Sequence, residues 1–241
     1  MEPPLFFAPI ENIQGEQIEL PATETHHALN VLRLRSGALV VVVDGLGTAY
    51  RGELRVESKK ISMVMVHAQI RNFGEPRCRL TLAAGLSAGF KFDDVVDKGT
   101  QLGVSRFVPL LTEKSKVKME DPRRIALKTA RLENVALAAM KQSRRSFRPE
   151  IVAPMTFAQF LNQTDRDSLR IVFQLADTCR SLSRVIPPES PKRATVLVGP
   201  EAGFTGDEFN SALTKGFLGV SLGPRVLRTE TAGPTACALL M

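Results

Sequence analysis

The stretch VLVGPEAGFTGDEF, residues 196–209, combines the features that decide the fold of the larger part of the chain. It begins as a short apolar run, continues as a turn with three glycines, and ends in the T-x-x-E pattern of Thr205 and Glu208, a capping box that starts a helix. The glycines, which allow the backbone of the turn to approach a ligand closely, are Gly199, Gly203 and Gly206. The turn matches neither a P-loop nor the GxGxxG pattern, so an ordinary strand-to-helix connection and a ligand loop both remain open.

A second glycine turn, LGPRVLRTETAG at residues 222–233, follows another apolar run. Arg225, Arg228 and Glu230 lie close together in it. An internal arginine–glutamate pair that ties the turn together would explain these charges. A contact with an anion or a base beside a ligand pocket would explain them equally well.

The helix after this turn is expected to begin late. Pro234 would remove an internal hydrogen bond from a helix that began at Thr229. We therefore expect the helix to begin near Gly233, which leaves the RTET sequence as an exposed loop.

Strand-like and helix-like segments alternate from residue 78 onward. Strands that are apolar on both faces and separated by helices indicate a parallel sheet covered on two sides. In such sheets ligands bind beyond the carboxyl ends of the strands, where both glycine turns lie. The strand-like runs are CRLTLAAGL (78–86), RFVPLL (106–111), RIVFQLA (170–176), ATVLVG (194–199) and GVSLG (219–223). The helix-like stretches are KFDDVVDKGTQLGV (91–104) and DPRRIALKTARLENVALAAMKQ (121–142).

The first 70 or so residues are mostly β in character, which predicts a small β-barrel with one helix. Thr23 is the expected N-cap of that helix, TETHHALNVLRL. The glycine and proline of RNFGEPR, residues 71–77, mark a linker, so we expect domains at 1–72 and 73–241. The strand-like runs are EQIEL (16–20), ALVVVVDG (38–45), AYRGELRVES (49–58) and KKISMVMVHAQI (59–70).

The charge balance favours a polyanionic partner without requiring one. The 241 residues carry a formal net charge of +7, and a basic excess of this kind is common in nucleic-acid-binding proteins. The run KQSRRSFRPE, residues 141–150, is either a solvated helix end or a patch that contacts phosphates and stacks a base. Arg33 and Arg35 extend the second interpretation to the amino-terminal domain.

Cysteine and histidine usage points away from metal and disulfide chemistry. The three cysteines are far apart and only three histidines are present, so neither a zinc site nor a disulfide framework is expected. No signal-peptide pattern opens the sequence, and its longest apolar run, residues 38–43, is too short to span a bilayer. These features predict a cytoplasmic protein without a membrane partner.

Four motifs together resemble the RsmE-like family of the SPOUT class, whose members methylate N3 of a uridine in 16S ribosomal RNA. They are VLVGPEAGF followed by DEF, SLGPRVLRTETA, QSRRSFRPEI and HHALNVLRLRSG, and they span nearly the whole chain in the family's order. The resemblance implies a PUA-like β-barrel joined to a SPOUT α/β domain with a carboxy-terminal trefoil knot. It also implies S-adenosylmethionine as the cofactor, a homodimer, and 16S rRNA or the small ribosomal subunit as the partner.

The resemblance also implies a set of site residues. The cofactor would be held largely by backbone groups of three loops, at Leu175, Gly199, Pro200, Glu201, Gly203, Leu222, Gly223, Val226 and Leu227. Arg228 and Glu230 follow the cofactor turn, so Arg228 is expected to contact the uridine or its phosphate, and Glu230 to orient it or accept its N3 proton. The residues expected to contact RNA are Arg33, Arg35, Arg144, Arg145 and Arg148.

Two positions depart from the family's pattern. Ala202 stands where a glycine is usual, which is a mild change if its φ is negative. Lys141 stands where a glutamate is usual, which argues against a carboxylate role at that position. Two other functions stay open: an RNA-binding, ribosome-associated protein without turnover, and a knotted methyltransferase that acts on another RNA.

Overall fold

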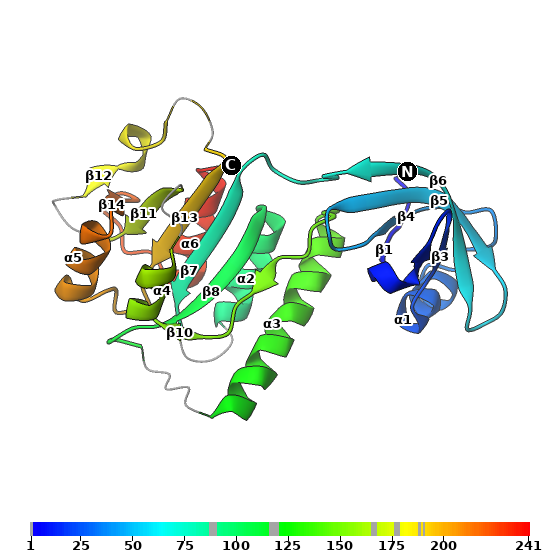
Figure 1. The fold of residues 1–241 in the computed structure, drawn as a ribbon, viewed down its shortest axis with the longest axis horizontal. Coiled ribbons are helices and arrows are strands. Elements are labelled where there is room, and N and C mark those ends of the chain that lie inside the picture. Colours follow the sequence, from blue (N-terminus) through cyan, green and yellow to red (C-terminus); the bar gives the residue numbers. More distant parts are fainter. Residues whose placement is uncertain are drawn as a thin grey trace. The chain divides into compact units, whose positions relative to one another are not determined.

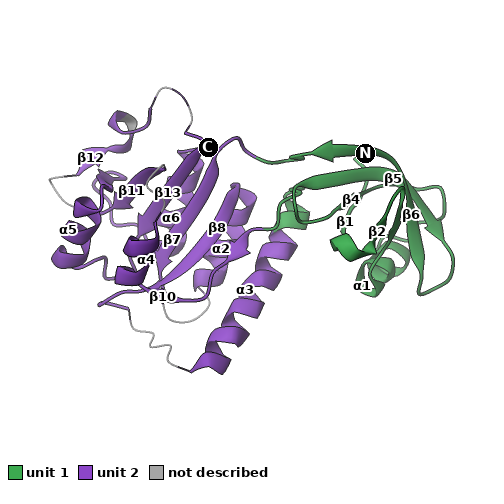
Figure 2. Ribbon diagram, viewed as in Figure 1, with its two compact units in different colours: residues 1–75, 140–148 green, residues 76–139, 149–241 purple. Residues whose placement is uncertain are grey.

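The computed structural model describes residues 2–86, 91–115, 121–164, 168–175, 179–187, 189 and 191–241. The chain forms two compact units, shown in Figures 1 and 2. The first comprises Met1–Glu75 and Met140–Arg148, and the second comprises Pro76–Ala139 and Pro149–Met241. The segment Met140–Arg148 therefore returns to the first unit, although the sequence assigned it to the second domain.

The first unit is a curled, six-stranded sheet around its own apolar core. Only β1 and β4 pair in parallel, and the other neighbours are antiparallel. Alternate residues of each strand point into a core that includes Phe6, Ile18, Leu54 and Val64. In sheet order the strands are β1 (Leu5–Phe7), β4 (Leu39–Val43), β5 (Thr48–Val56), β6 (Ser62–Arg71), β3 (Gln17–Glu19) and β2 (Ile13–Gln14). A short 3-10 turn, η1, spans Ile10–Asn12.

The helix of the first unit begins two residues earlier than expected. Helix α1 spans Ala22–His26 with Pro21 as its N-cap, so the prediction of Thr23 as the cap is wrong. Proline fits the start of a helix because the first amide groups lack intrahelical partners anyway. A π-helical turn, η2 (His27–Val31), follows, and Arg33 then adopts a left-handed conformation with φ of 53°.

The second unit is an eight-stranded sheet among the described residues, and every pairing in it is parallel. This confirms the parallel α/β arrangement predicted from the two-sided apolar runs. In sheet order the strands are β10 (Met155–Thr156), β8 (Val104–Leu111), β7 (Arg79–Gly85), β13 (Arg193–Val198), β11 (Leu169–Phe173), β14 (Leu218–Ser221) and β12 (Arg180–Ser181), with β9 (Glu150–Ile151) beside β8.

Helices cover both faces of this sheet, as Figure 1 shows. Leu82 of β7 faces a core with α2 and α6, whereas the next residue, Ala83, faces a second core with α4 and α5. Burial on both faces explains why these strands read as continuous apolar runs. The helices are α2 (Lys91–Gln101), α3 (Pro122–Gln142), α4 (Phe157–Gln163), α5 (Gly206–Thr214) and α6 (Thr229–Ala238), with a 3-10 turn, η3, at Leu182–Arg184. The capping box of Thr205 and Glu208 forms as predicted.

Helix α6 begins at Thr229, so the expectation of a start near Gly233 is wrong. Pro234 lies inside the helix and leaves the carbonyl of Glu230 without its usual amide partner. Packing outweighs that loss, because Ala232, Gly233 and Pro234 are all buried against the sheet. A β-carbon on Gly233 would come within 3.4 Å of the Leu82 side chain, so the small residues let the helix lie close to β7.

No described helix is both long and apolar enough to cross a bilayer. None of the three cysteines, all of which lie within the described residues, forms a disulfide, and Cys78 and Cys237 are buried.

Candidate active site

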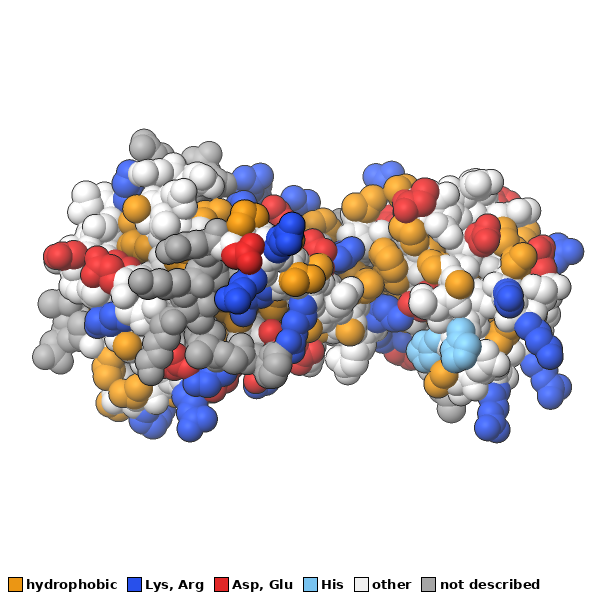
Figure 3. Space-filling model, turned by 90° about the horizontal axis from the view of Figure 1, so that it is seen from below, with side chains coloured by type: hydrophobic (Ala, Val, Ile, Leu, Met, Phe, Trp, Pro, Cys, Tyr) orange, Lys and Arg blue, Asp and Glu red, His pale blue; other side chains and the backbone are white. Residues whose placement is uncertain are grey.

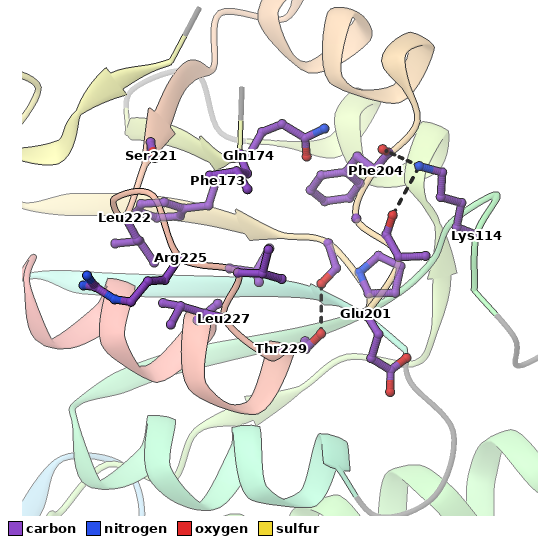
Figure 4. Close-up of a pocket in the computed structure, with 18 of the residues that line it drawn as sticks. Lys114, Phe173, Gln174, Glu201, Phe204, Ser221, Leu222, Arg225, Leu227 and Thr229 are labelled. Carbon is purple, nitrogen blue, oxygen red and sulfur yellow. Dashed lines mark hydrogen bonds between the residues drawn. The ribbon is translucent and has the colours of Figure 1, made fainter. Parts of the chain in front are cut away.

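A pocket of about 290 Å³ opens at the carboxyl ends of three adjacent strands of the second unit. The loops after β11, β13 and β14 form its walls, as shown in Figure 4. The structure thus brings together the two glycine turns and a third loop that lie far apart in the sequence. All nine residues expected to hold a cofactor line this pocket: Leu175, Gly199, Pro200, Glu201, Gly203, Leu222, Gly223, Val226 and Leu227.

The loop after β13 is a tight turn that requires its glycines. The amide of Gly203 donates to the carbonyl of Pro200 over 2.8 Å, and Gly203 has φ of +69°. A β-carbon on Gly199 would lie 3.0 Å from the backbone of Gly203. Ala202 does not adopt a positive φ, so alanine fits at a position where the resembled family usually has glycine.

The loop after β14 is held to the first loop through the start of α6. Gly223 has φ of +102°, and its amide donates to the hydroxyl of Ser221 over 3.1 Å. The hydroxyl of Thr229, the first residue of α6, donates to the carbonyl of Gly199 over 3.2 Å. This bond joins the two loops that face each other across the pocket (Figure 4).

Among the described residues that line the pocket, the charged groups are one carboxylate and two cations. Glu201 forms an ion pair with Lys91 at the start of α2, while Lys114 and Arg225 supply positive charge. Apolar side chains complete the lining and suit a flat, partly apolar ligand such as an adenine ring. They include Phe173, Leu175, Leu222, Val226 and Leu227.

Lys114, which follows β8 and lines the pocket, was not among the site residues predicted from the sequence. Its ammonium group donates to the carbonyls of Ala202 and Phe204 over 3.2 and 3.1 Å. One signal was present in the sequence: Lys114 stands just after the apolar run RFVPLL, at the carboxyl end of a strand. The same edge of a parallel sheet carries the ligand loops.

Arg228 and Glu230 do not line the pocket, although their neighbour Thr229 does. Arg228 is exposed as the N-cap of α6. Glu230 is half-buried in the first turn, and its Oε2 atom is buried without a hydrogen-bond partner. Neither residue, nor Arg225, forms an ion pair with any part of the chain that the structure describes. The interpretation of these charges as an internal pair that ties the turn together therefore finds no support.

The expectation that Arg145 contacts RNA is not met, because Arg145 is only 2% exposed. Its Nε and Nη2 atoms donate to Oε2 of Glu75 over 3.2 and 2.7 Å. The other oxygen of Glu75 accepts from the amides of Ser146 and Phe147. A buried arginine needs such a partner because burying an uncompensated charge is costly. Arg145 is therefore a structural residue of the first unit.

The rest of the segment Met140–Arg148 is also tied to the first unit. Arg144 is half-buried, pairs with Glu2 over 3.1 Å and donates to the carbonyl of Pro3 over 3.0 Å. Lys141, which replaces the usual glutamate, forms an ion pair with the buried Glu24. Arg148 is half-buried, and its amide donates to the carbonyl of Gly45. The main chain of Arg144 can lie close to Gly74 because Gly74 lacks a side chain. A β-carbon there would lie 2.4 Å from the carbonyl of Arg144.

Arg33 and Arg35 remain as fully exposed cations on the first unit. Lysine and arginine side chains are present on both units in the face shown in Figure 3. The described residues contain no group of three or more metal-ligating side chains.

Comparisons with known proteins agree on one family. The family model described as an RNA methyltransferase domain matches residues 74–241, and the model described as an RNA methyltransferase PUA domain matches residues 20–62. A ribosomal RNA small subunit methyltransferase E from Synechocystis sp. is 31% identical over 230 residues, which cover 95% of this chain and 74% of that protein. The protein of the same description from Bacillus subtilis is 30% identical, with coverage of 93% and 87%.

Two solved structures match over almost the whole chain. A ribosomal RNA small subunit methyltransferase E from Neisseria gonorrhoeae, bound to S-adenosyl methionine, has a TM-score of 0.86 and 30% identity, covering 99% of this chain and 96% of that one. A Legionella pneumophila protein in complex with the same cofactor has a TM-score of 0.86 and 29% identity, covering 100% and 97%. The predicted order of a PUA-like unit followed by an α/β unit is confirmed.

Proposed function

We propose that this chain, which belongs to the ribosomal RNA small subunit methyltransferase E family, transfers a methyl group from S-adenosylmethionine to N3 of a uridine in 16S ribosomal RNA. The observation that carries the proposal is the three-loop pocket, because all nine residues expected to hold the cofactor line it. An RNA-binding protein without turnover would not require this pocket to keep its shape. The shape depends on Gly199, where a side chain would press on Gly203, and on Gly203, whose positive φ disfavours a side chain.

The residues present fit the cofactor. A β-carbon at Gly199 would press on the opposite side of its own turn, so the loop is built for a close backbone approach. The apolar side chains of Leu175, Leu222 and Leu227 suit the adenine ring, and backbone groups of the loops suit its polar edge. When bound, S-adenosylmethionine supplies a methyl group on a cationic sulfonium.

The chain's own residues must align the acceptor base and deal with its N3 proton. We assign Arg228, exposed at the start of α6, to the uridine or its phosphate, where its positive charge would stabilise the uridine anion. We assign Glu230, the residue after the pocket-lining Thr229, to orienting the uridine or accepting its N3 proton. Both residues lie within two positions of a side chain that lines the pocket.

The two units receive different roles in this proposal. The predicted domain at 1–72 anchors RNA through Arg33 and Arg35, and the predicted domain at 73–241 carries out methyl transfer. The substrate is the 16S rRNA of the small subunit, and the protein acts in the cytoplasm.

We further infer a homodimer and a carboxy-terminal trefoil knot, as in the resembled family. The exposed apolar side chains near the pocket and the end of α6 support the dimer, because such groups are usually covered by a partner surface. They are Leu175, Val226, Leu239 and Met241. Light scattering that gives the mass of one chain at micromolar concentration would count against the dimer.

The direct test of the function is mass mapping of 16S rRNA from a strain that lacks this protein. One uridine should lose a methyl group, and purified protein with S-adenosylmethionine should restore it on small subunits from that strain. Unchanged methylation of 16S rRNA together with loss of a methyl group elsewhere would favour a knotted methyltransferase for another RNA. Calorimetry that detects no cofactor binding would favour RNA binding without turnover.

A further inference from the structure

The turn that carries Lys114 is rigid. It begins at Thr112, directly after β8, and closes on itself because the amide of Thr112 donates to the hydroxyl of Ser115 over 3.1 Å. The amide of Glu113 donates to Oε1 of Glu208 over 2.9 Å. The other oxygen of Glu208 accepts from the amide of Thr205. One buried carboxylate therefore ties this turn to the end of the loop after β13.

Lys114 reaches from this fixed base to the wall of the pocket. Its ammonium group donates to the carbonyls of Ala202 and Phe204 (Figure 4). These two carbonyls flank Gly203, which has φ of +69° and, as a glycine, a wide choice of backbone conformations. A lysine has three donors and no acceptor, so a single ammonium group can fix both carbonyls at once.

The other described anchors of this loop hold different parts of it. Thr229 holds the carbonyl of Gly199 at the loop's beginning, and Lys91 pairs with the side chain of Glu201. Among the contacts described, Lys114 is the side chain that restrains the main chain on both sides of Gly203. The peptide planes on either side of a glycine rotate easily without such a restraint.

We propose that Lys114 is a positioning residue for the cofactor, which keeps the loop at residues 199–204 in its binding-competent shape. The proposal rests on the proposed function, because it takes S-adenosylmethionine as the ligand of this pocket. Loss of the ammonium group removes one positive charge from the pocket lining and raises the number of loop conformations that binding must order. Cofactor affinity should therefore fall, whereas turnover at saturating cofactor should change little.

The test is calorimetric titration of S-adenosylmethionine into the wild-type protein, Lys114→Met, Lys114→Arg and Lys98→Met. We expect Lys114→Met to raise the Kd for the cofactor roughly tenfold, the effect of losing charge-assisted bonds at a partly solvated site. Lys114→Arg keeps the charge and donors and should bind within about threefold of wild type. Lys98→Met removes an exposed lysine of α2 and should leave the Kd unchanged.

Steady-state kinetics completes the test. For Lys114→Met the KM for the cofactor should rise while kcat stays within about threefold of wild type. A fall in melting temperature with an unchanged KM would overturn the proposal, because a merely structural tether behaves that way. A fall in kcat with an unchanged KM would overturn it too. If the wild-type protein itself does not bind the cofactor, the proposed function fails rather than the role of Lys114.

Discussion

Two arginine-bearing segments, Met140–Arg148 and the loop at residues 222–230, look alike in the sequence and differ completely in the structure. In the first, Arg144 pairs with Glu2 and Arg145 with Glu75. In the second, Arg225 and Arg228 are exposed and pair with no described carboxylate. An arginine keeps its capacity to bind an anion only where the fold supplies no acid of its own.

The difference has a physical cause that no local pattern contains. Glu75 lies 70 positions from Arg145 in the sequence, and the fold alone brings them together. A buried charge is tolerated when it is paired, and the pair then holds the segment in place instead of binding a ligand. The predictions below test whether the two segments really divide into a structural and a functional one.

The largest effect should come from breaking the buried pair. Arg145→Met leaves the carboxylate of Glu75 without its cation, and removing one partner of a buried pair typically costs about 3–5 kcal/mol of unfolding free energy. Arg225→Met, at an exposed site, should change stability by less than about 0.5 kcal/mol. Urea unfolding followed by circular dichroism reports on both units, and tyrosine fluorescence reports on the first, because Tyr50 is the single tyrosine and the chain has no tryptophan. Equal losses in the two variants would abolish the distinction.

Most of the framework of the site was predictable, because it depends on local patterns. The apolar runs at residues 194–199 and 219–223 predicted parallel strands, and the position of the glycine turns predicted that their loops would meet. The capping box at Thr205 formed as expected. Local chemistry fixes each of these elements, so tertiary context did not overturn them.

The failures at α6 and Lys114 share one feature: their cause lies far away in the sequence. The start of α6 depends on packing against Leu82, which outweighs the local penalty of Pro234. Lys114 lies almost 90 positions from the carbonyls that it holds. Propensity and spacing carry no information on such contacts.

The second-largest effect is a fall in turnover, which we expect for a variant in the loop at residues 222–230. Arg228→Ala should lower kcat by roughly a hundredfold, the usual consequence of losing one contact that stabilises the transition state. Its melting temperature and cofactor affinity should stay at wild-type values, because the side chain is exposed and does not line the pocket. Arg144→Gln, in the structural segment, should keep kcat within about threefold.

Glu230→Gln keeps the shape of the side chain and removes its charge. It should lower kcat in the same way if the carboxylate accepts the N3 proton. A variant that methylates at the wild-type rate from about pH 6 to 9 would show that the proton leaves to water.

The third effect is a pH dependence of the unfolding free energy, which we expect in the second unit. Burial raises the pKa of the Cys237 thiol in α6, the helix that follows the pocket loop. A thiol whose pKa is higher in the folded than in the unfolded state stabilises the fold below about pH 8.5 and loses that contribution as the pH rises. Between about pH 7.5 and 9.5 this thiol should cost about 1.4 kcal/mol of unfolding free energy.

Urea unfolding followed by circular dichroism measures this loss. It is carried out at both pH values on the wild-type protein and on Cys237→Ala. Burial also raises the pKa of Cys78, which contributes equally in both proteins, so the difference isolates Cys237. A loss of equal size in Cys237→Ala would contradict the assignment.

The smallest effect is a change in the salt dependence of RNA binding. Each phosphate neutralised by an arginine steepens the slope of log K against log salt by about 0.7–0.9, because counterions are released. Arg33 and Arg35 are exposed on the first unit, so the double variant Arg33→Gln, Arg35→Gln should flatten the slope on unmethylated small subunits by about 1.5.

Arg144→Gln is the matched control, because Glu2 and the carbonyl of Pro3 already occupy its guanidinium group. Its slope should stay within about 0.3 of wild type. If Arg144→Gln flattens the slope as much as the double variant does, Arg144 exchanges Glu2 for a phosphate on binding, and the segment is functional as well as structural.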